Sequence, residues 1–427
     1  MENRKYTIVM ISDHPLASSG VGTQTKYIIQ KMLDSGKFRI ISLAGMKEVR
    51  DQRLQKIKEW GDDVVIIPTE GYGNPEILRQ IIAAESPDAL WLMTDPRFYE
   101  WLFAMEHEVR KSMPILYNAI WDNPPAPKYN IPHYSSCDFI GCISKVTKQV
   151  VDELGFGDRS EYIPHGVPAD DFKILHNKTE RELKIEYFGV DHKDSFVLFY
   201  NSRNALRKRT GNVIMAFKEF RDSLPEEERD KVLLFMHTPP DDPEGQDLHV
   251  IRRDFDLRGS LKFSDKKVPP HIMNEFYNLS QVTVSMSSEE GFGLSVLESL
   301  MTGTPVICTK TGGMQDQVID PDTGEEFGFC MEAQARSLIG SQRTPYLWQH
   351  HLDPSAVAEK FKVLYDEWVA DPIGYKEKFA GTRARESMIR RFNLDTITER
   401  WVEKFEEEIL KFESKQNKQR TFDTLTI

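Results

Sequence analysis

The fold is decided by residues 281–308, which read QVTVSMSSEEGFGLSVLESLMTGTPVIC. The apolar run at 281–285 predicts a buried strand, and the segment after it predicts a helix that begins just after Glu290 and ends at Gly303. Residues 304–308 predict the next strand. Strand, helix and strand in this order form one βαβ unit of a parallel sheet.

The same alternation of strands and helices runs outward from this unit in both directions. Further strands are predicted at 6–12, 39–43, 63–67, 89–93, 114–120, 139–143, 161–163, 196–200, 231–236 and 261–263. Helical patterns lie between several of them, as at 23–33 and 75–84. Parallel sheets with helices on both faces show this alternation. We therefore predict an α/β protein with two Rossmann-like, doubly wound domains that face each other across a cleft.

Shifts in this pattern predict the domain boundaries. The first domain spans 1–168, a linker spans 169–194 and the second domain spans 195–372. Helical periodicity continues beyond residue 354, and we expect C-terminal helices at 373–413 that pack back toward the N-terminal domain. Residues 414–427 are polar and lack periodicity, which indicates a surface tail.

Composition and charge limit the possible functions. The 427 residues include 55 Lys and Arg against 67 Asp and Glu, a formal net charge of −12. This charge repels polyanions, so an anionic ligand needs a local binding site. No apolar run reaches the ~18 residues of a membrane span, and no signal cleavage site follows the N-terminus. We expect a cytoplasmic protein.

Disulfide and metal chemistry find little support in the sequence. Four cysteines, at 137, 142, 308 and 330, are too few for a disulfide framework in so long a chain, and no pair has the CxxC spacing of a zinc site. The segments at 254–256 and 320–322 resemble a DxD metal motif only in their letters, and 320–324 is better explained as a turn. We predict free thiols and no metal site.

The loop within residues 288–298 carries the strongest candidates for chemistry. Gly291 and Gly293 allow the backbone to approach a ligand closely, and amides at the start of a helix suit an anionic group. Glu290 precedes this helix and Glu298 lies inside it, which places their carboxylates roughly 10 Å apart along one side of an extended ligand. A solvated pair of glutamates beside a glycine turn is the alternative.

This loop, followed by Gly303–Val306 (GTPV) and Thr311–Gly313 (TGG), resembles the signature of the retaining GT-B glycosyltransferases of the family four type. The resemblance implies a nucleotide diphosphate sugar of UDP or GDP type as donor substrate, and no cofactor. It also implies that the nucleotide ribose is bound by Glu298. The residues implied to contact the donor are Glu290, Gly291, Phe292, Gly293 and Leu294.

A basic stretch matches a second motif of this family. Residues 201–208 read NSRNALRK, in which Arg203 and Lys208 resemble the Arg-x4-Lys pair that grips the donor diphosphate. Fixed cations lower the barrier because the leaving group gains charge in the transition state. The family usually has Gly after the Lys, whereas this chain has Arg209. A solvated basic turn is the alternative.

Two stretches of the first domain resemble further family motifs. The loop at 18–23 (SSGVGT) contains Gly20 and Gly22 and resembles the glycine loop that approaches the donor phosphate and the acceptor. Residues 163–168 (IPHGVP) resemble the motif that closes the first domain, with His165 where Asn is more common. We expect His165 to line the cleft. An ordinary tight turn is the alternative for the glycine loop.

The acceptor side departs from the family pattern. Trp121 stands where the family has a His near the reacting sugar, and Asp95 lies close to the position of another common His. We consider Trp121 a stacking platform for the acceptor, and Asp95 or Asp122 a group that orients or deprotonates the acceptor hydroxyl. Burial of Trp121 in the core and turn roles for both aspartates are the alternatives.

These motifs predict a metal-independent, retaining glycosyltransferase. It would move a hexosyl or related sugar to a hydroxyl of a sugar, glycoconjugate or other acceptor, with Arg203, Lys208, Glu290 and Asp122 as catalytic residues. One alternative is a transferase that modifies a hydroxylated nucleic acid base. The other is a nucleotide-sugar-binding protein without catalysis.

Overall fold

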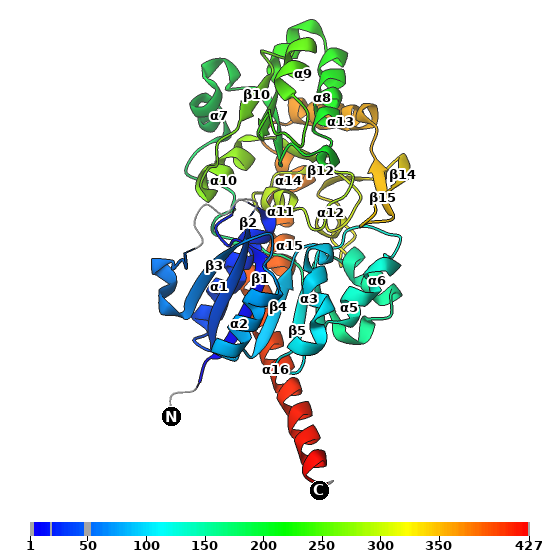
Figure 1. Ribbon diagram of the computed structural model, residues 1–427. Coiled ribbons are helices and arrows are strands. Elements are labelled where there is room, and N and C mark those ends of the chain that lie inside the picture. Colours follow the sequence, from blue (N-terminus) through cyan, green and yellow to red (C-terminus); the bar gives the residue numbers. More distant parts are fainter. Residues whose placement is uncertain (1–3, 18, 47–52, 426–427) are drawn as a thin grey trace. The chain divides into compact units, whose positions relative to one another are not determined.

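The computed structural model describes residues 4–17, 19–46 and 53–425, and the chain forms two compact units (Figure 1). Unit 1 comprises Met1–His165, Gly340–Tyr346 and Leu394–Ile427. Unit 2 comprises Gly166–Ile339 and Leu347–Asn393. The chain therefore leaves unit 1 and returns to it twice.

Unit 1 is built on a parallel sheet of seven strands in the order β3-β2-β1-β4-β5-β6-β7. Every residue of β4, β5 and β6 is buried, as expected for strands covered on both faces. The strands are β1 (Tyr6–Asp13), β2 (Phe38–Met46), β3 (Val64–Glu70), β4 (Ala89–Met93), β5 (Ile115–Ala119), β6 (Phe139–Cys142) and β7 (Ser160–Tyr162). The α-helices are α1 (Gly20–Asp34), α2 (Pro75–Glu85), α3 (Glu100–Ala104), α4 (Glu106–Val109), α5 (Ile131–Ser135), α6 (Lys145–Glu153) and α16 (Leu394–Leu425). Short 3-10 helices are η1 (Lys58–Asp63), η2 (Pro96–Tyr99), η3 (Lys128–Asn130) and η4 (Gly157–Arg159).

The last helix of the chain, α16, packs on the sheet of unit 1. The Trp401 ring meets Trp91 of β4 edge-on at 5.8 Å and Phe139 of β6 at 6.0 Å. Gly141 makes room for this ring, since a Cβ at that position would lie 2.5 Å from it. The apolar face of α16 thus covers the part of the unit 1 core that contains β4 and β6.

Unit 2 repeats the architecture with six parallel strands in the order β10-β9-β8-β11-β12-β13. These strands are β8 (Phe196–Asn201), β9 (Val232–His237), β10 (Leu261–Ser264), β11 (Val282–Ser285), β12 (Val306–Thr309) and β13 (Gly328–Met331), and a separate antiparallel pair consists of β14 (Ala335–Ile339) and β15 (Leu347–His351). The α-helices are α7 (Glu180–Phe188), α8 (Thr210–Ser223), α9 (Leu248–Asp254), α10 (Pro270–Leu279), α11 (Leu294–Met301), α12 (Met314–Val318), α13 (Pro354–Ala370), α14 (Tyr375–Phe379) and α15 (Gly381–Phe392). Short 3-10 helices are η5 (Val190–His192), η6 (Leu206–Lys208) and η7 (Glu226–Lys231).

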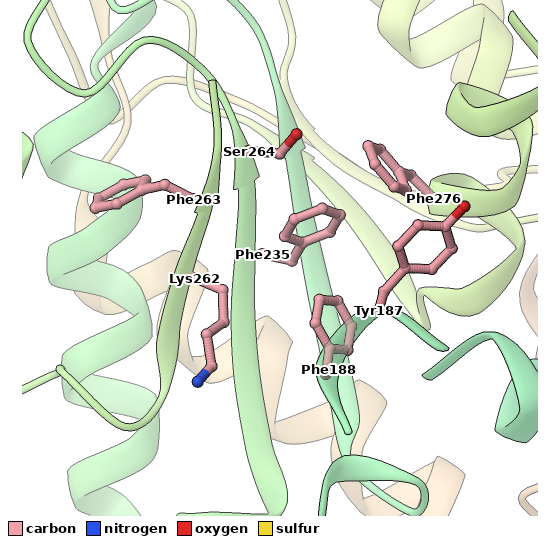
Figure 2. Close-up of a pocket in the computed structure, with 7 residues that line it drawn as sticks. All are labelled: Tyr187, Phe188, Phe235, Lys262, Phe263, Ser264 and Phe276. Carbon is pink, nitrogen blue, oxygen red and sulfur yellow. The ribbon is translucent and has the colours of Figure 1, made fainter. Parts of the chain in front are cut away.

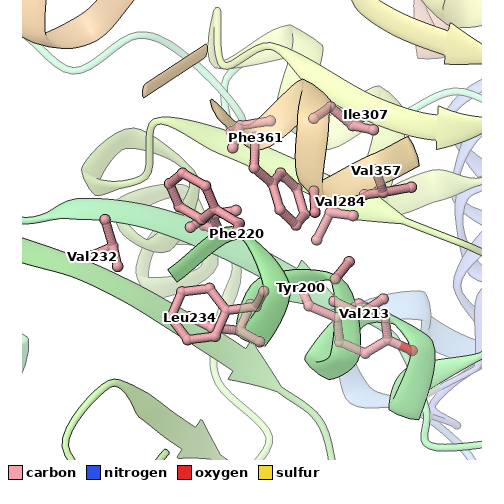
Figure 3. Close-up of a cluster of buried hydrophobic side chains, with 14 of the residues drawn as sticks. Tyr200, Val213, Phe220, Val232, Leu234, Val284, Ile307, Val357 and Phe361 are labelled. Carbon is pink, nitrogen blue, oxygen red and sulfur yellow. The ribbon is translucent and has the colours of Figure 1, made fainter. Parts of the chain in front are cut away.

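The core of unit 2 lies between this sheet and helices α8 and α13. Figure 3 shows Phe220 of α8 and Phe361 of α13 among side chains from the strands, including Leu234 and Val284. All of these side chains are buried. The apolar stripes of two helices and one face of the sheet therefore share a single core.

The two doubly wound α/β sheets confirm the predicted fold class, but several predicted boundaries are wrong. Residues 169–194 are no simple linker, because they belong to unit 2 and contain α7, which starts with a Thr179–Glu182 capping box. The predicted polar tail is helical, because residues 414–425 continue α16, and 426–427 lie outside the described residues. The helices at 373–413 divide between the units, with α14 and α15 in unit 2 and α16 in unit 1. All four cysteines are free, as expected.

Candidate functional site

The two predicted donor motifs lie at the same edge of the sheet of unit 2. The strand order changes direction between β8 and β11, because β9 and β10 follow on one side and β12 and β13 on the other. Open parallel sheets bind ligands beyond the carboxyl ends of their strands at such a switch point. Residues 202–209 follow β8 and residues 286–293 follow β11, so both motifs reach this point.

Glu290 lies at the centre of a charged cluster. Its carboxylate binds the ammonium group of Lys208, and Arg207 Nη1 lies 3.8 Å from Glu290 Oε2. Ser287 Oγ donates to the same oxygen at 3.4 Å. Burial favours a higher pKa of the Glu290 carboxyl, but Lys208 and Arg207 outweigh it and the pKa is lowered. Glu290 is therefore ionised, and Lys208 is held next to it.

Glycines bring the loops after β11 and β12 into close contact. Gly293 precedes α11 with φ 89°, a left-handed conformation that side chains disfavour. At Gly312 (φ 46°), a Cβ would lie 1.7 Å from the carbonyl oxygen of Glu290. No side chain in the described part of the chain caps α11, so the amides at its start remain suited to an anion.

Two predicted donor contacts differ in how they can act. Phe292 is 3% exposed, and its ring packs edge-on against Phe392 of α15 at 5.7 Å. Its side chain is therefore part of the core, and only its backbone belongs to the loop. Leu294 is the first residue of α11 and is partly exposed.

Glu298 is a partly buried carboxylate that receives hydrogen bonds from neutral groups. Tyr277 Oη donates to Glu298 Oε2 at 2.7 Å, and Asn201 Nδ2 lies 3.5 Å from the same oxygen. Burial raises the pKa of Glu298 to about 7. A carboxylate kept in such surroundings is typical of a binding or catalytic site.

The two cations of the predicted Arg203–Lys208 pair bind different carboxylates. The Arg203 guanidinium makes a bidentate ion pair with Asp242, at 2.6 and 2.9 Å, and also lies 3.0 Å from Glu244. Both acids follow β9, whereas Lys208 faces Glu290. No spacing pattern points to Asp242, because this residue is distant from the motif in the chain.

Two further arginines flank Lys208. Arg207 Nη1 donates to the carbonyl oxygen of Glu289 at 2.9 Å and so joins the loops after β8 and β11. Arg209, which replaces the usual Gly, has φ 54°. Its Nε and Nη2 atoms are buried and have no hydrogen-bond partner among the described residues. The departure from the family motif thus gives this loop an additional, partly buried arginine.

The predicted glycine loop of unit 1 is largely helical. Gly20 and Gly22 lie in the first turn of α1, whose N-cap Ser19 accepts from the Gly22 amide at 3.0 Å. A Cβ at Gly22 would lie 2.7 Å from the carbonyl oxygen of His14, which explains the glycine there. Ser18 lies outside the described residues.

Asp13 was missed by the sequence analysis. It is the last residue of β1, and its carboxylate accepts hydrogen bonds from Tyr72 Oη at 2.7 Å and from Ser19 Oγ at 2.5 Å. Burial and the negative charge of Asp13 raise the pKa of Tyr72. An acidic residue that ends a buried strand just before a glycine turn is the signal that could have identified Asp13.

Asp95 lies on the same edge of this sheet, after β4. Both oxygens of Asp95 bind the Arg97 guanidinium, at 2.7 Å from Nε and 2.5 Å from Nη2. Arg97 also donates to Thr344, which belongs to the 340–346 segment of unit 1. Asp95 is therefore one half of an ion pair.

The other acceptor-side candidates are less accessible than expected. Trp121 is 7% exposed, and its Nε1 donates to the carbonyl oxygen of Asn123 at 2.7 Å. The alternative of a core role thus describes Trp121 better than a stacking platform. Asp122 beside it is partly buried. His165, the last residue of its segment of unit 1, is buried, and burial lowers its pKa to about 3.

A pocket of about 310 Å³ lies elsewhere in unit 2 (Figure 2). Its lining comes from α7, β9, β10 and α10 and contains Tyr187, Phe188, Phe235, Lys262, Phe263, Ser264 and Phe276. None of the predicted site residues lines it.

Among the described residues, no group of three or more His, Cys, Asp or Glu side chains is arranged to hold a metal ion. No helix within the described ranges has the length and apolar character to cross a membrane.

Comparisons with known proteins agree with this arrangement. Residues 181–339, all within unit 2, match the family model described as glycosyl transferases group 1. Unit 2 contains a glycosyl transferases group 1 domain. The domain holds both loops of the switch point, with Lys208 and Glu290, and also Glu298 of α11.

Individual proteins resemble shorter or longer parts of the chain. A trehalose synthase of Pyrococcus horikoshii is 30% identical over 162 residues, which cover 37% of this chain and 38% of that protein. A D-inositol 3-phosphate glycosyltransferase of Acidothermus cellulolyticus is 28% identical over 240 residues, 55% of this chain and 52% of that protein. The chain thus spans about half or less of the length of these relatives.

Solved structures match nearly the whole chain. The Anabaena HepE structure with UDP and glucose has a TM-score of 0.67 at 14% identity and covers 94% of this chain and 100% of that chain. Sucrose-phosphate synthase from Thermosynechococcus elongatus has a TM-score of 0.70 at 15% identity, with coverage of 94% and 99%. The chain has the two-domain GT-B fold.

Proposed function

We propose that the protein transfers a sugar from a nucleotide diphosphate sugar to an acceptor hydroxyl, with retention of the anomeric configuration and without a metal ion. The observation that carries this proposal is the switch point of unit 2, where Lys208, Glu290 and Glu298 meet at one edge of the sheet. Two comparisons support it. One is the match to the glycosyl transferases group 1 family, and the other is the similar fold of Anabaena HepE, which has been solved in complex with UDP-glucose.

The donor would lie along the loops after β8 and β11. The ribose hydroxyls would donate to the Glu298 carboxylate, whose present partners are neutral donors. The diphosphate would bind the first amides of α11 and the cations of the 203–209 loop. Glu290 would accept from hydroxyls of the donor sugar.

The cations of the 203–209 loop would also stabilise the leaving group during transfer. When the acceptor oxygen bonds to the anomeric carbon, the bond from that carbon to the diphosphate breaks and negative charge develops on the departing oxygen. Lys208 and Arg207, fixed around Glu290, stabilise that charge without a metal ion. Asp122 is proposed to orient or deprotonate the acceptor hydroxyl.

A nucleotide-sugar-binding protein without transfer is a second candidate. The pairing of Arg203 with Asp242 and Glu244 favours it, because this cation is engaged away from Lys208. Slow hydrolysis of the donor in the absence of acceptor distinguishes the two candidates. Hydrolysis supports the transferase, whereas stable binding without turnover supports the binding protein.

A donor screen by thermal shift tests the proposal. The full chain is heated with UDP, GDP and their glucose and mannose conjugates, in buffer containing EDTA. A ligand at 100 times its Kd adds about 2.7 kcal/mol to the free energy of unfolding, which gives a measurable rise in Tm. One nucleoside diphosphate family should stabilise the protein. Stabilisation by none of them contradicts the proposal.

A further inference from the structure

The edge of unit 1 where β1 and β4 end carries a distinctive set of side chains. The strand order of this sheet changes direction between β1 and β4, so the loops after these strands leave from one switch point. Asp13 ends β1, and Asp95 and Phe98 follow β4. If the proposed function holds and unit 2 binds the donor, this edge is the place for an acceptor.

The charges at this edge are unsuited to an anion. Asp13 is hydrogen-bonded to two hydroxyl groups, those of Tyr72 and Ser19, and these carry no charge that would neutralise it. The Nε and Nη2 atoms of Arg97 each bind one carboxylate oxygen of Asp95, so this ion pair contributes no net positive charge. In the described residues of the loops after β1 and β4, Arg97 is the one Lys or Arg side chain and it is already paired, so a phosphate bound between these loops would meet the Asp13 carboxylate.

An exposed aromatic ring lies beside these groups. Phe98 is 50% exposed, and its ring lies 5.1 Å from the ring of Tyr72, whose hydroxyl donates to Asp13. Tyr72 connects the Phe98 ring to the Asp13 carboxylate, and an exposed aromatic ring offers an apolar face on which a ligand can stack. Sugars combine an apolar ring face with hydroxyl donors, and this combination matches Phe98 together with Asp13.

We propose that unit 1 selects a neutral polyhydroxylated acceptor, a sugar or polyol without phosphate or carboxylate. Its ring packs on Phe98 and one hydroxyl donates to Asp13. The proposal rests on the proposed glycosyltransferase function and names the acceptor class for it.

Matched pairs of acceptors test this inference. The release of nucleoside diphosphate from the donor identified by the thermal-shift screen is measured with glucose against glucose 6-phosphate, and with myo-inositol against its 1-phosphate. The neutral member of a pair should give a kcat/KM at least ten times larger. A preference for the phosphorylated member, stimulation by none of the neutral compounds, or stimulation by an oligonucleotide with hydroxymethylated bases overturns the proposal.

Two variants separate a charge effect from a structural one. Asp13→Asn should lower the ratio of kcat/KM for the neutral acceptor to kcat/KM for the phosphorylated acceptor about ten-fold. The control is Asp34→Asn, at an exposed aspartate that ends α1, and it should leave this ratio unchanged. Phe98→Ala removes only a half-exposed ring and should raise the acceptor KM several-fold. An unchanged ratio in Asp13→Asn, or an unchanged KM in Phe98→Ala, overturns the assignment. Failure of wild type to bind any nucleoside diphosphate contradicts the proposed function instead.

Discussion

Replacing Glu298 with Gln should stabilise the fold and weaken nucleotide binding at the same time. Burial raises the pKa of this carboxyl from 4.5 to about 7 in the folded protein. One pKa unit corresponds to about 1.4 kcal/mol, so the ionised carboxylate costs the folded state about 3.4 kcal/mol. The Gln side chain can still accept from Tyr277 and carries no charge.

The sign of the pH dependence follows from the raised pKa. Protonated Glu298 is compatible with its buried position, so the full stability is present below pH 4.5 and is lost as the pH rises through 7. Relative to wild type, the Gln variant should gain about 2 kcal/mol at pH 6 and about 3.4 kcal/mol at pH 8. Urea unfolding at pH 4.5, 6 and 8 measures this difference, with Glu386→Gln as an exposed control on α15 in the same unit.

The same substitution should weaken nucleotide binding, although it stabilises the fold. A carboxylate that accepts from ribose hydroxyls contributes about 1.5 to 3 kcal/mol, so the Gln variant should bind UDP or GDP roughly ten to 150 times more weakly at pH 8. Wild-type affinity should rise between pH 6 and pH 8 as Glu298 ionises, and the affinity of the variant should stay constant. A variant that is less stable than wild type at pH 8 and has an unchanged Kd in calorimetric titration would refute this reasoning.

The remaining predictions concern the charged cluster, the glycine contact, the last helix and metal dependence. Lys208→Met should lower kcat at saturating donor by more than 100-fold while the donor KM changes less, since the departing charge is greatest in the transition state; a rise in KM alone would assign Lys208 to ground-state binding. Gly312→Ala should lower Tm well beyond Gly324→Ala, because both residues have positive φ but only a Cβ at Gly312 meets backbone, the carbonyl oxygen of Glu290; equal shifts would contradict the contact. Trp401→Ala should cost about 3 to 5 kcal/mol in urea unfolding by opening a cavity against the sheet of unit 1, and a loss below 1 kcal/mol would contradict the packing of α16. Activity should survive EDTA, and activity that is lost in EDTA and restored by manganese would contradict metal independence.

The sequence predicted the parallel strands well because their burial forces continuous apolar runs. The predicted strand at 89–93 coincides with β4, every residue of which is buried. The hairpin β14–β15 was missed for the opposite reason. All five residues of β14 are exposed, so no apolar period marks them. The predicted helical stretch at 373–413 is interrupted between α14 and α15, where Gly381 adopts φ 55°.

The candidate site was predictable in its location but only partly in its contacts. Motif spacing pointed to Lys208 and Glu290, which lie in the loops after β8 and β11, and to Glu298 in α11, which follows the second loop. The direction of Arg203 was not predictable, because Asp242 reaches it from the loop after β9. The burial of Trp121 depends on the surrounding packing of unit 1, which the residues next to it in the chain do not reveal.

Proton NMR of donor turnover tests the central claim most directly. The full chain is incubated in EDTA with the UDP- or GDP-sugar selected by the thermal-shift screen, and the anomeric signals are followed from the first minutes, before mutarotation. An α-linked donor should yield the free nucleoside diphosphate together with an α-configured sugar product. A product that appears first as the β-anomer would contradict retention, and an unchanged donor spectrum under conditions where the nucleotide binds would contradict glycosyl transfer itself.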